Sequence, residues 1–215
     1  MSYFEVNWSY NDRMKRVREI VFVLLLSISG DGAAAPQLDS RDVLSLDPSK
    51  SEVFLLPSKS KTDFNGSIGI KGGSVVVKYG VLSSAKIVLD LNRIIMGGGG
   101  DPGWKAKVVV HLKGRDFFSV NQFPTATFYI NSVNQASKTV GEYDVAGDLS
   151  MRGIRKPVRF KMKMVADKGV YSVSGRVILD TASWGIRYKS EELNSLYRGR
   201  TLKDYFELTF ALKTL

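Results

Sequence analysis

The 215-residue sequence predicts an all-β fold, a single antiparallel barrel of eight strands with one or two short helices. Three observations support this. Apolar and polar residues alternate with a period of two through most of the chain after Thr62. Glycine-rich or polar turns separate the alternating segments. Eight or nine strands in about 150 residues would leave exposed edges unless the sheet closes on itself, and a barrel removes those edges.

Composition excludes several functional classes. The chain has no Cys and one His, which rules out disulfide scaffolds, thiolate metal sites, cysteine nucleophiles and sites built on several histidines. The formal net charge is +10, and all of it comes from residues 36–215. Such a balance favours anionic partners.

The first 35 residues have the pattern of an export signal. A basic segment, Met14–Arg18, precedes the apolar run Ile20–Leu26, and small residues follow at Ala33–Ala35. The apolar stretch is about half the ~20 residues that a membrane span needs. We therefore expect a signal peptide whose translation starts at Met14, and a periplasmic or secreted mature protein. A buried N-terminal strand or a short anchor is the alternative.

The remaining chain divides into a leading segment, 36–59, and a barrel domain, 60–215. Turn signals at Lys71–Gly73, Gly97–Gly103 and Asp167–Gly169 separate several of the alternating runs. We expect strands at 64–70, 74–80, 84–94, 106–113, 125–134, 142–151, 158–165, 170–180 and 202–213, and short helices at 115–121 and 189–197.

No residue pattern in the sequence carries catalysis or metal binding. His111 falls on the polar row of its expected strand, and the sequence does not identify which residue would assist it as a base, so we interpret it as a surface residue. Gly97–Gly100 is not followed by the Lys-Ser/Thr of a phosphate-binding loop. We expect no enzyme activity, no catalytic residues, no metal site and no cofactor.

A basic row shares one face of the expected strands. Aromatic residues lie on the opposite parity, whereas nucleic-acid binders place them among the charges, so no nucleic-acid partner is expected. We interpret the row as a solvated barrel exterior, with weak contact to an anionic membrane surface as the alternative. Its members are Lys107, Lys113, Arg159, Lys161 and Lys163.

Two blocks resemble a known family. Gly114–Phe128 reads GRDFFSVNQFPTATF and Tyr143–Val158 reads YDVAGDLSMRGIRKPV. Both are similar to signature blocks of the YceI-like family, and the resemblance extends over about 60–213. The chain also resembles further landmarks of this family at Phe64–Ser67, Trp184–Ile186 and Lys203–Leu208. Asp180-Thr181 stands where the family often has Asn/Asp-Arg.

The resemblance implies an exported, lipocalin-like barrel that binds a long isoprenoid or a related amphiphile in an apolar cavity. The expected ligand is therefore a polyprenyl or isoprenoid-quinone-like lipid. A homodimer is an alternative to a monomer that the sequence does not decide. Parity and side-chain size suggest the residues of the cavity: Val108, Val110, Phe128, Phe160, Met162, Phe206, Leu208 and Phe210 along the interior, with Phe117, Phe118, Phe123 and Trp184 near one end.

Two alternatives remain beside this hypothesis. A barrel whose interior is filled by side chains would produce the same alternation. The chain would then be an interaction protein that binds anionic partners through its basic surface. The other alternative is a small lipid-modifying enzyme with His111 as the base.

Overall fold

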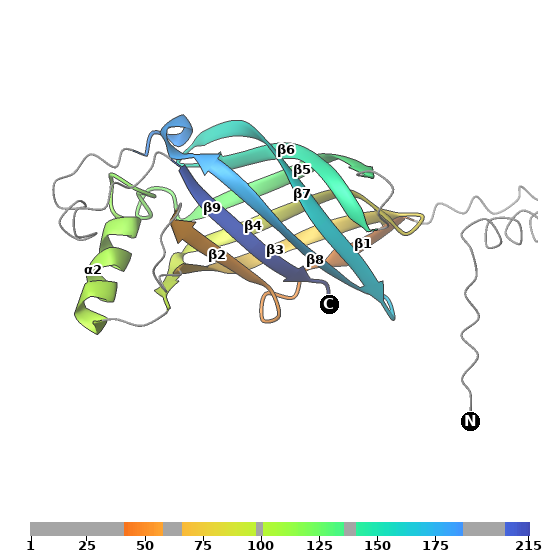
Figure 1. The fold of residues 1–215 in the computed structure, drawn as a ribbon, viewed down its shortest axis with the longest axis horizontal. Helices are drawn as coiled ribbons and strands as arrows, with labels where there is room; N and C mark the ends of the chain where they lie inside the picture. Colours follow the sequence, from red (N-terminus) through yellow and green to blue (C-terminus); the bar gives the residue numbers. More distant parts are fainter. Residues whose placement is uncertain (1–40, 58–65, 98–100, 136–140, 187–204) are drawn as a thin grey trace, which may run out of the picture. The chain divides into compact units, whose positions relative to one another are not determined.

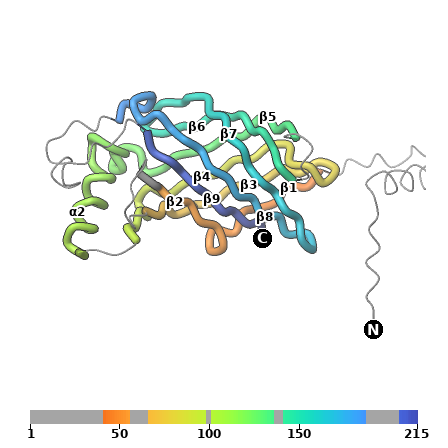
Figure 2. Tube along the Cα trace, viewed as in Figure 1, coloured from red at the N-terminus to blue at the C-terminus, as the bar shows by residue number. Residues whose placement is uncertain are grey.

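The computed structural model describes residues 41–57, 66–97, 101–135, 141–186 and 205–215. Strands dominate these residues (Figures 1 and 2). They are β1 (Arg41–Ser45), β2 (Glu52–Pro57), β3 (Gly66–Lys78), β4 (Val81–Met96), β5 (Thr125–Gln135), β6 (Glu142–Met151), β7 (Ile154–Asp167), β8 (Val170–Asp180) and β9 (Tyr205–Lys213). An α-helix, α2 (Pro102–Lys113), and a 3-10 helix, η1 (Thr181–Trp184), accompany them.

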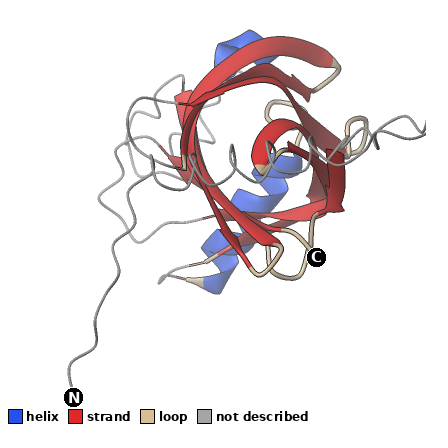
Figure 3. Ribbon diagram, turned by 90° about the vertical axis from the view of Figure 1, so that its right-hand side faces the viewer, coloured by secondary structure: helices blue, strands red, loops and turns tan. Residues whose placement is uncertain are grey.

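The strands close into an antiparallel barrel with eight positions. β1 and β2 occupy one position, because β1 pairs with Ser74–Lys78 of β3 and β2 pairs with Gly66–Ile68 of the same strand. β2 also pairs with β9, and strands that are consecutive in the sequence then pair with one another from β9 back to β4 and β3. The end-on view shows the resulting ring (Figure 3). The prediction of an all-β, eight-stranded barrel is confirmed.

The leading segment 36–59 supplies β1 and β2, which were not expected. Leu46 forms an isolated bridge with Thr214, and the amide of Asp47 donates to the carbonyl of Lys213 at 2.8 Å. Both strands are short and depend on partners far away in the sequence. Their local alternation was therefore too brief to predict them.

The expected strands 64–70 and 74–80 form the single strand β3. Gly72 and Gly73, read as a turn, lie inside β3, where the register with β4 shifts between Ile70 and Gly72. A glycine pair within a strand commonly marks such a bulge. The turn prediction at this point was wrong.

Residues 106–113 are helical, so the strand predicted there was wrong. Asp101 caps α2 by accepting a hydrogen bond from the amide of Trp104 at 2.6 Å, and Pro102 occupies the first helical position. These two residues start a helix strongly enough to offset the β-branched run at Val108–Val110. Residues 115–121 form turns, with the amide of Ser119 donating to the carbonyl of Gly114 at 2.7 Å. The helix predicted at 189–197 lies outside the described residues.

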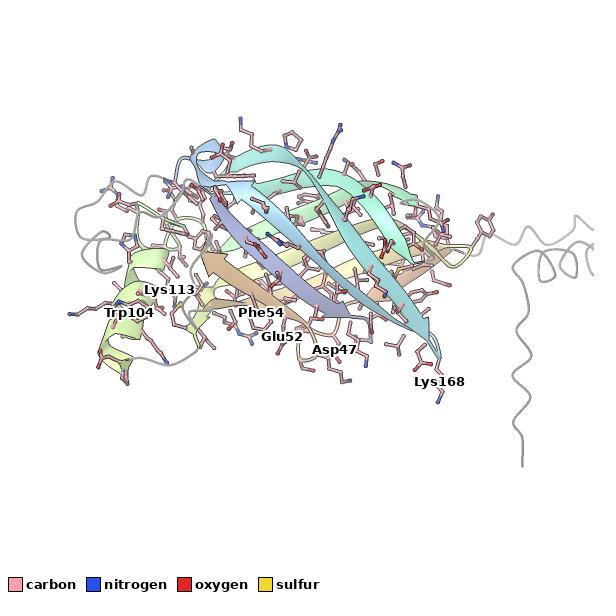
Figure 4. All side chains as sticks on the ribbon, in the orientation of Figure 1. Asp47, Glu52, Phe54, Trp104, Lys113 and Lys168 are labelled. Carbon is pink, nitrogen blue, oxygen red and sulfur yellow. The ribbon has the colours of Figure 1, made fainter. Side chains whose placement is uncertain are left out.

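The barrel has two distinct ends. The helix end carries α2, η1 and the β6–β7 turn, and the hairpin end carries the β3–β4 turn and the β7–β8 turn at Lys168–Gly169 (Figure 1). Figure 4 labels Trp104 and Lys113 on α2 and Lys168 at the opposite end. Alternate residues of every long strand are buried and form one continuous core. In the described part of the chain, no helix is long and apolar enough to cross a membrane.

Candidate ligand cavity in the barrel interior

A small apolar cavity lies inside the barrel. Its volume is about 20 Å³, which is room for about one water molecule. Every lining side chain is aliphatic or aromatic, so the cavity presents no hydrogen-bonding or charged side chain to its contents. The lining residues are Val53, Ile87, Leu89, Phe128, Phe160, Val177, Leu208, Phe210 and Leu212.

Three phenylalanine rings occupy much of the interior. The centroids of Phe128 and Phe160 are 6.3 Å apart at an interplanar angle of 79°, and those of Phe160 and Phe210 are 5.6 Å apart at 83°. Both are edge-to-face contacts, the arrangement that the ring quadrupole favours. A Cβ on Gly175 would lie 2.5 Å from Cζ of Phe210, so the absence of a side chain on β8 makes room for this ring.

Four of the predicted cavity residues line this space: Phe128, Phe160, Leu208 and Phe210. Phe206 lies nearer the helix end, where it closes the interior together with Phe117 and Phe118. The ring centroids of Phe117 and Phe118 are 4.5 Å apart, and both lie 6.2–6.3 Å from that of Phe206.

Other predicted residues are buried elsewhere. Val108 is buried on α2, and Met162 is buried on β7. Trp184 is 3% exposed, and its indole nitrogen donates to the carbonyl of Leu149 at 3.3 Å. Trp184 therefore belongs to the helix end; it was expected near one end of the barrel, and the sequence did not specify which.

The last two predicted residues lie outside the cavity and are not fully buried. Val110 is 72% exposed on α2, because the helical period turns it away from the side that carries Val108. Its assignment to the interior was wrong. Phe123 is half-buried and lies against the β6–β7 turn, where a Cβ on Gly153 would be 3.1 Å from its ring.

Five lining residues were missed: Val53, Ile87, Leu89, Val177 and Leu212. The alternation of Ala85, Ile87 and Leu89 along β4 could have found two of them, because all three are buried. Val53 had no comparable signal, since β2 contributes only a few inward residues.

The pairing of β7 with β8 stops beside this cavity. The two strands are paired from Asp167 and Val170 as far as Lys161 and Arg176, and no ladder joins them beyond that pair. A groove of about 290 Å³ lies between the unpaired stretches, and we call it the notch. Its lining residues are Lys156, Pro157, Val158, Arg159, Ile178, Leu179, Asp180, Ser183 and Trp184.

Charged groups with shifted pKa values lie outside the cavity. The pKa of Asp47 is lowered to about 2, mainly because its carboxylate accepts a hydrogen bond from the Ser49 hydroxyl, with Lys50 also contributing. A hydrogen bond to Asp144 raises the pKa of Lys161 above its usual value. Asp47 lies between β1 and β2, and Lys161 faces outward on β7, so neither group belongs to the cavity.

The described residues hold no cluster of three or more His, Cys, Asp or Glu that could ligate a metal. His111 lies on α2 instead of a strand, and it is half-buried. Its ring meets that of Phe117 edge-on, at a centroid distance of 6.2 Å. The chemistry available inside the barrel is therefore apolar contact.

Comparison with known proteins agrees with this architecture. Over 55 residues, the chain is 38% identical to protein YceI of Shigella flexneri, and the match spans 26% of this chain and 27% of that relative's length. The crystal structure of BcnA from Burkholderia cenocepacia superposes with a TM-score of 0.64 at 17% identity, covering 79% of this chain and 99% of the other.

A polyisoprenoid binding domain from Saccharophagus degradans superposes with a TM-score of 0.57 at 16% identity, covering 79% of this chain and 96% of the other. At these identities the structural likenesses describe the fold. The model of the YceI-like domain matches residues 44–214, which takes in β2 to β9 and the end of β1. The chain therefore belongs to the YceI-like family.

Proposed function

We propose that this protein is an exported lipid carrier that holds an isoprenoid chain inside its barrel, without catalysing a reaction. The observation that carries the proposal is the wholly apolar lining of the interior cavity. Burial of an isoprenoid there would gain about 25 cal/mol per Å² of apolar surface removed from water. Membership of the YceI-like family and the fold shared with a polyisoprenoid binding domain support the same function.

The ligand would take the place of side chains that now fill the interior. Phe160 is half-buried and directly follows Arg159, which lines the notch, so outward rotation of its ring would open a path for the ligand. Met162 and Met164 lie on the same face of β7, and methionine side chains adapt readily to a new neighbour. Rotation of Phe128, Phe160 and Phe210 would enlarge the 20 Å³ cavity by the space that their rings now fill.

Mass spectrometry of an organic extract tests the proposal. The full chain is expressed in a bacterial host that performs export, purified without detergent and extracted. We expect a near-stoichiometric isoprenoid lipid in the extract. A Leu208→Trp variant, which fills the cavity, should carry much less lipid while keeping the strand-rich circular dichroism spectrum.

A second candidate function follows from the small size of the cavity. An interior with only 20 Å³ of free space is consistent with a filled core, and the chain would then bind anionic partners through its basic surface. Absence of lipid from the extract, together with no uptake of added isoprenoid quinone, would favour this candidate. It also predicts partner binding that weakens steeply with salt.

Export is the part of the proposal that rests on residues 1–35 alone. Sequencing the N-terminus of protein recovered from the periplasm or medium tests it. We expect the mature chain to begin near Ala35. Recovery of an uncleaved chain from the cytoplasm alone would overturn this part of the proposal.

A further inference from the structure

We infer that the notch between β7 and β8 holds the anionic head group of the bound lipid, of the phosphate-ester class. The inference deepens the proposed function and rests on it. Four positions of β7, Pro157–Phe160, would face Val177–Asp180 if the pairing of Lys161 with Arg176 continued. No ladder joins these two stretches, so side chains rather than backbone hydrogen bonds close the wall of the barrel over their length.

The notch adjoins the interior cavity along the same pair of strands. Phe160 and Val177 line the cavity, and they directly follow the last paired residues of β7 and β8. The next residues, Arg159 and Ile178, line the notch. The isoprenoid chain of a ligand inside the barrel could therefore pass between β7 and β8 beside Phe160, so that its polar head group lies outside the barrel.

The floor of the notch is apolar and its rim is charged. Val158, Leu179 and Trp184 are buried beneath it, being 7%, 2% and 3% exposed. Lys156 and Arg159 stand on the β7 side of the rim and are exposed. An amphiphile matches this arrangement, with its first isoprene units on the floor and its head group at the rim.

The two cations on the rim differ from their neighbours. Among the described residues, neither Lys156 nor Arg159 has a carboxylate within salt-bridge distance. Three nearby cations do have a partner, at 2.7–2.8 Å: Arg155 with Asp148, Lys161 with Asp144, and Arg176 with Glu207. Lys156 and Arg159 are therefore available to an anionic group, and Arg and Lys are the side chains that proteins use for phosphate.

Asp180 is the acidic residue of the notch. Its carboxylate is directed to η1, where it accepts hydrogen bonds from the amide of Ala182 at 3.1 Å and from the Ser183 hydroxyl at 3.0 Å. The lining still has one more cation than anion. Because Asp180 is held by η1, its charge is oriented away from direct pairing with the two cations.

A pair of ligands with the same isoprenoid chain tests the inference. Farnesyl phosphate and farnesol are titrated into the full-length protein by calorimetry, and inorganic phosphate serves as a third ligand. We expect farnesyl phosphate to bind about tenfold more tightly than farnesol, in line with the strength of charge-assisted hydrogen bonds. Inorganic phosphate should not bind measurably.

Two double variants locate the preference. Lys156→Gln/Arg159→Gln should bind both ligands with the affinity that farnesol shows for the original protein. The matched control, Lys71→Gln/Lys163→Gln, removes the same charge from exposed positions away from the notch and should keep the preference. Thermal melts of both variants check that the barrel is intact.

The outcomes separate the two proposals. Equal binding of farnesyl phosphate and farnesol would overturn the head-group site and leave the carrier function standing. A preference that survives Lys156→Gln/Arg159→Gln would also overturn the site. Binding of inorganic phosphate by itself would assign the notch to a free anion instead of a lipid. Binding of neither lipid would contradict the carrier function itself.

Discussion

Two seams of the barrel share an alternation of buried and exposed residues but are paired over different lengths. The β3–β4 seam is paired from Gly66 and Met96 to Lys78 and Val81, although three register shifts interrupt it. The β7–β8 seam is paired only from Lys161 to Asp167, and the other half of β7 faces the notch. Both seams alternate buried and exposed residues. Alternation therefore determines which side chains face inward, but not whether two strands stay joined.

Pro157 lies in the unpaired half of β7. A proline has no amide proton to donate to a ladder, and it is found in sheets where one side of the strand lacks a neighbour. β7 keeps its pairing with β6 along this stretch, with Pro157 opposite Asp148. The strand is thus paired on the β6 side and unpaired on the β8 side, which leaves room for the notch between β7 and β8.

The largest expected difference between the two seams is in the protection of their backbone amides against hydrogen exchange. We expect the amides that join Ile70 and Leu89 across β3–β4 to exchange only through global unfolding, which costs about 5–15 kcal/mol in a domain of this kind. Amides of β7 and β8 that face the notch should show little protection. Mass spectrometry of exchange over time measures both, and equal protection would contradict an open seam.

Replacing Trp184 tests what supports the open seam. Trp184→Ala removes a buried ring from the floor of the notch and a hydrogen bond to Leu149. We expect a loss of about 3–5 kcal/mol in the free energy of unfolding, as for other buried aromatic residues. Urea unfolding followed by circular dichroism measures it. Trp104→Ala, at a half-buried position on α2, should cost less; an equal loss would mean that Trp184 has no special part in the wall.

Gly175 tests the point at which β8 leaves β7. A Cβ there would meet Cζ of Phe210 at 2.5 Å and the carbonyl of Lys161 at 3.0 Å. We expect Gly175→Ala to lower the free energy of unfolding by about 1–3 kcal/mol, because the added methyl group overpacks the interior. Ser172→Ala, at an exposed position on the same strand, should stay within about 0.5 kcal/mol of the original protein. Similar free energies of unfolding for Gly175→Ala and Ser172→Ala would show that the ring of Phe210 moves aside freely.

Asp47 provides a smaller test on the closed side of the barrel. Its pKa of about 2 in the folded protein lies below the ordinary value of 3.8, so the ionised carboxylate stabilises the fold above about pH 4. That contribution is lost as the pH falls from 3.8 through 2. Asp47→Asn should therefore lower the melting temperature at pH 7, and the difference from the original protein should shrink towards pH 2. A difference that does not change with pH would exclude this carboxylate as its cause.

The interior face of β7 and β9 was predictable from the sequence. Phe160, Met162, Leu208 and Phe210 were assigned inward by parity, and all four are core residues or pack against the core. Period-two alternation is a local property of a half-buried strand, so it is readable without knowledge of the partner. The same reasoning failed at Val110, because a period of two was applied to a segment that is helical.

The signal for that helix was present in the sequence. Asp101-Pro102 is a capping residue followed by a proline at the first helical position, which is a common start for a helix. The prediction instead followed the alternation over 106–113, where the β-branched run Val108–Val110 favours a strand. In the folded chain, Val108 and Leu112 pack onto the core, and this tertiary contact offsets the weak helix propensity of the valines.

The sequence by itself determined an all-β barrel, its family and the inward-facing residues of β7 and β9, because these follow from local alternation and from two contiguous motifs. Tertiary structure alone decided that β1 and β2 share one position, that Trp184 reaches Leu149, and that β7 parts from β8 at Lys161. Each of these depends on residues distant in sequence meeting at a particular register. Register is a property of two strands together, so neither strand's sequence specifies it alone.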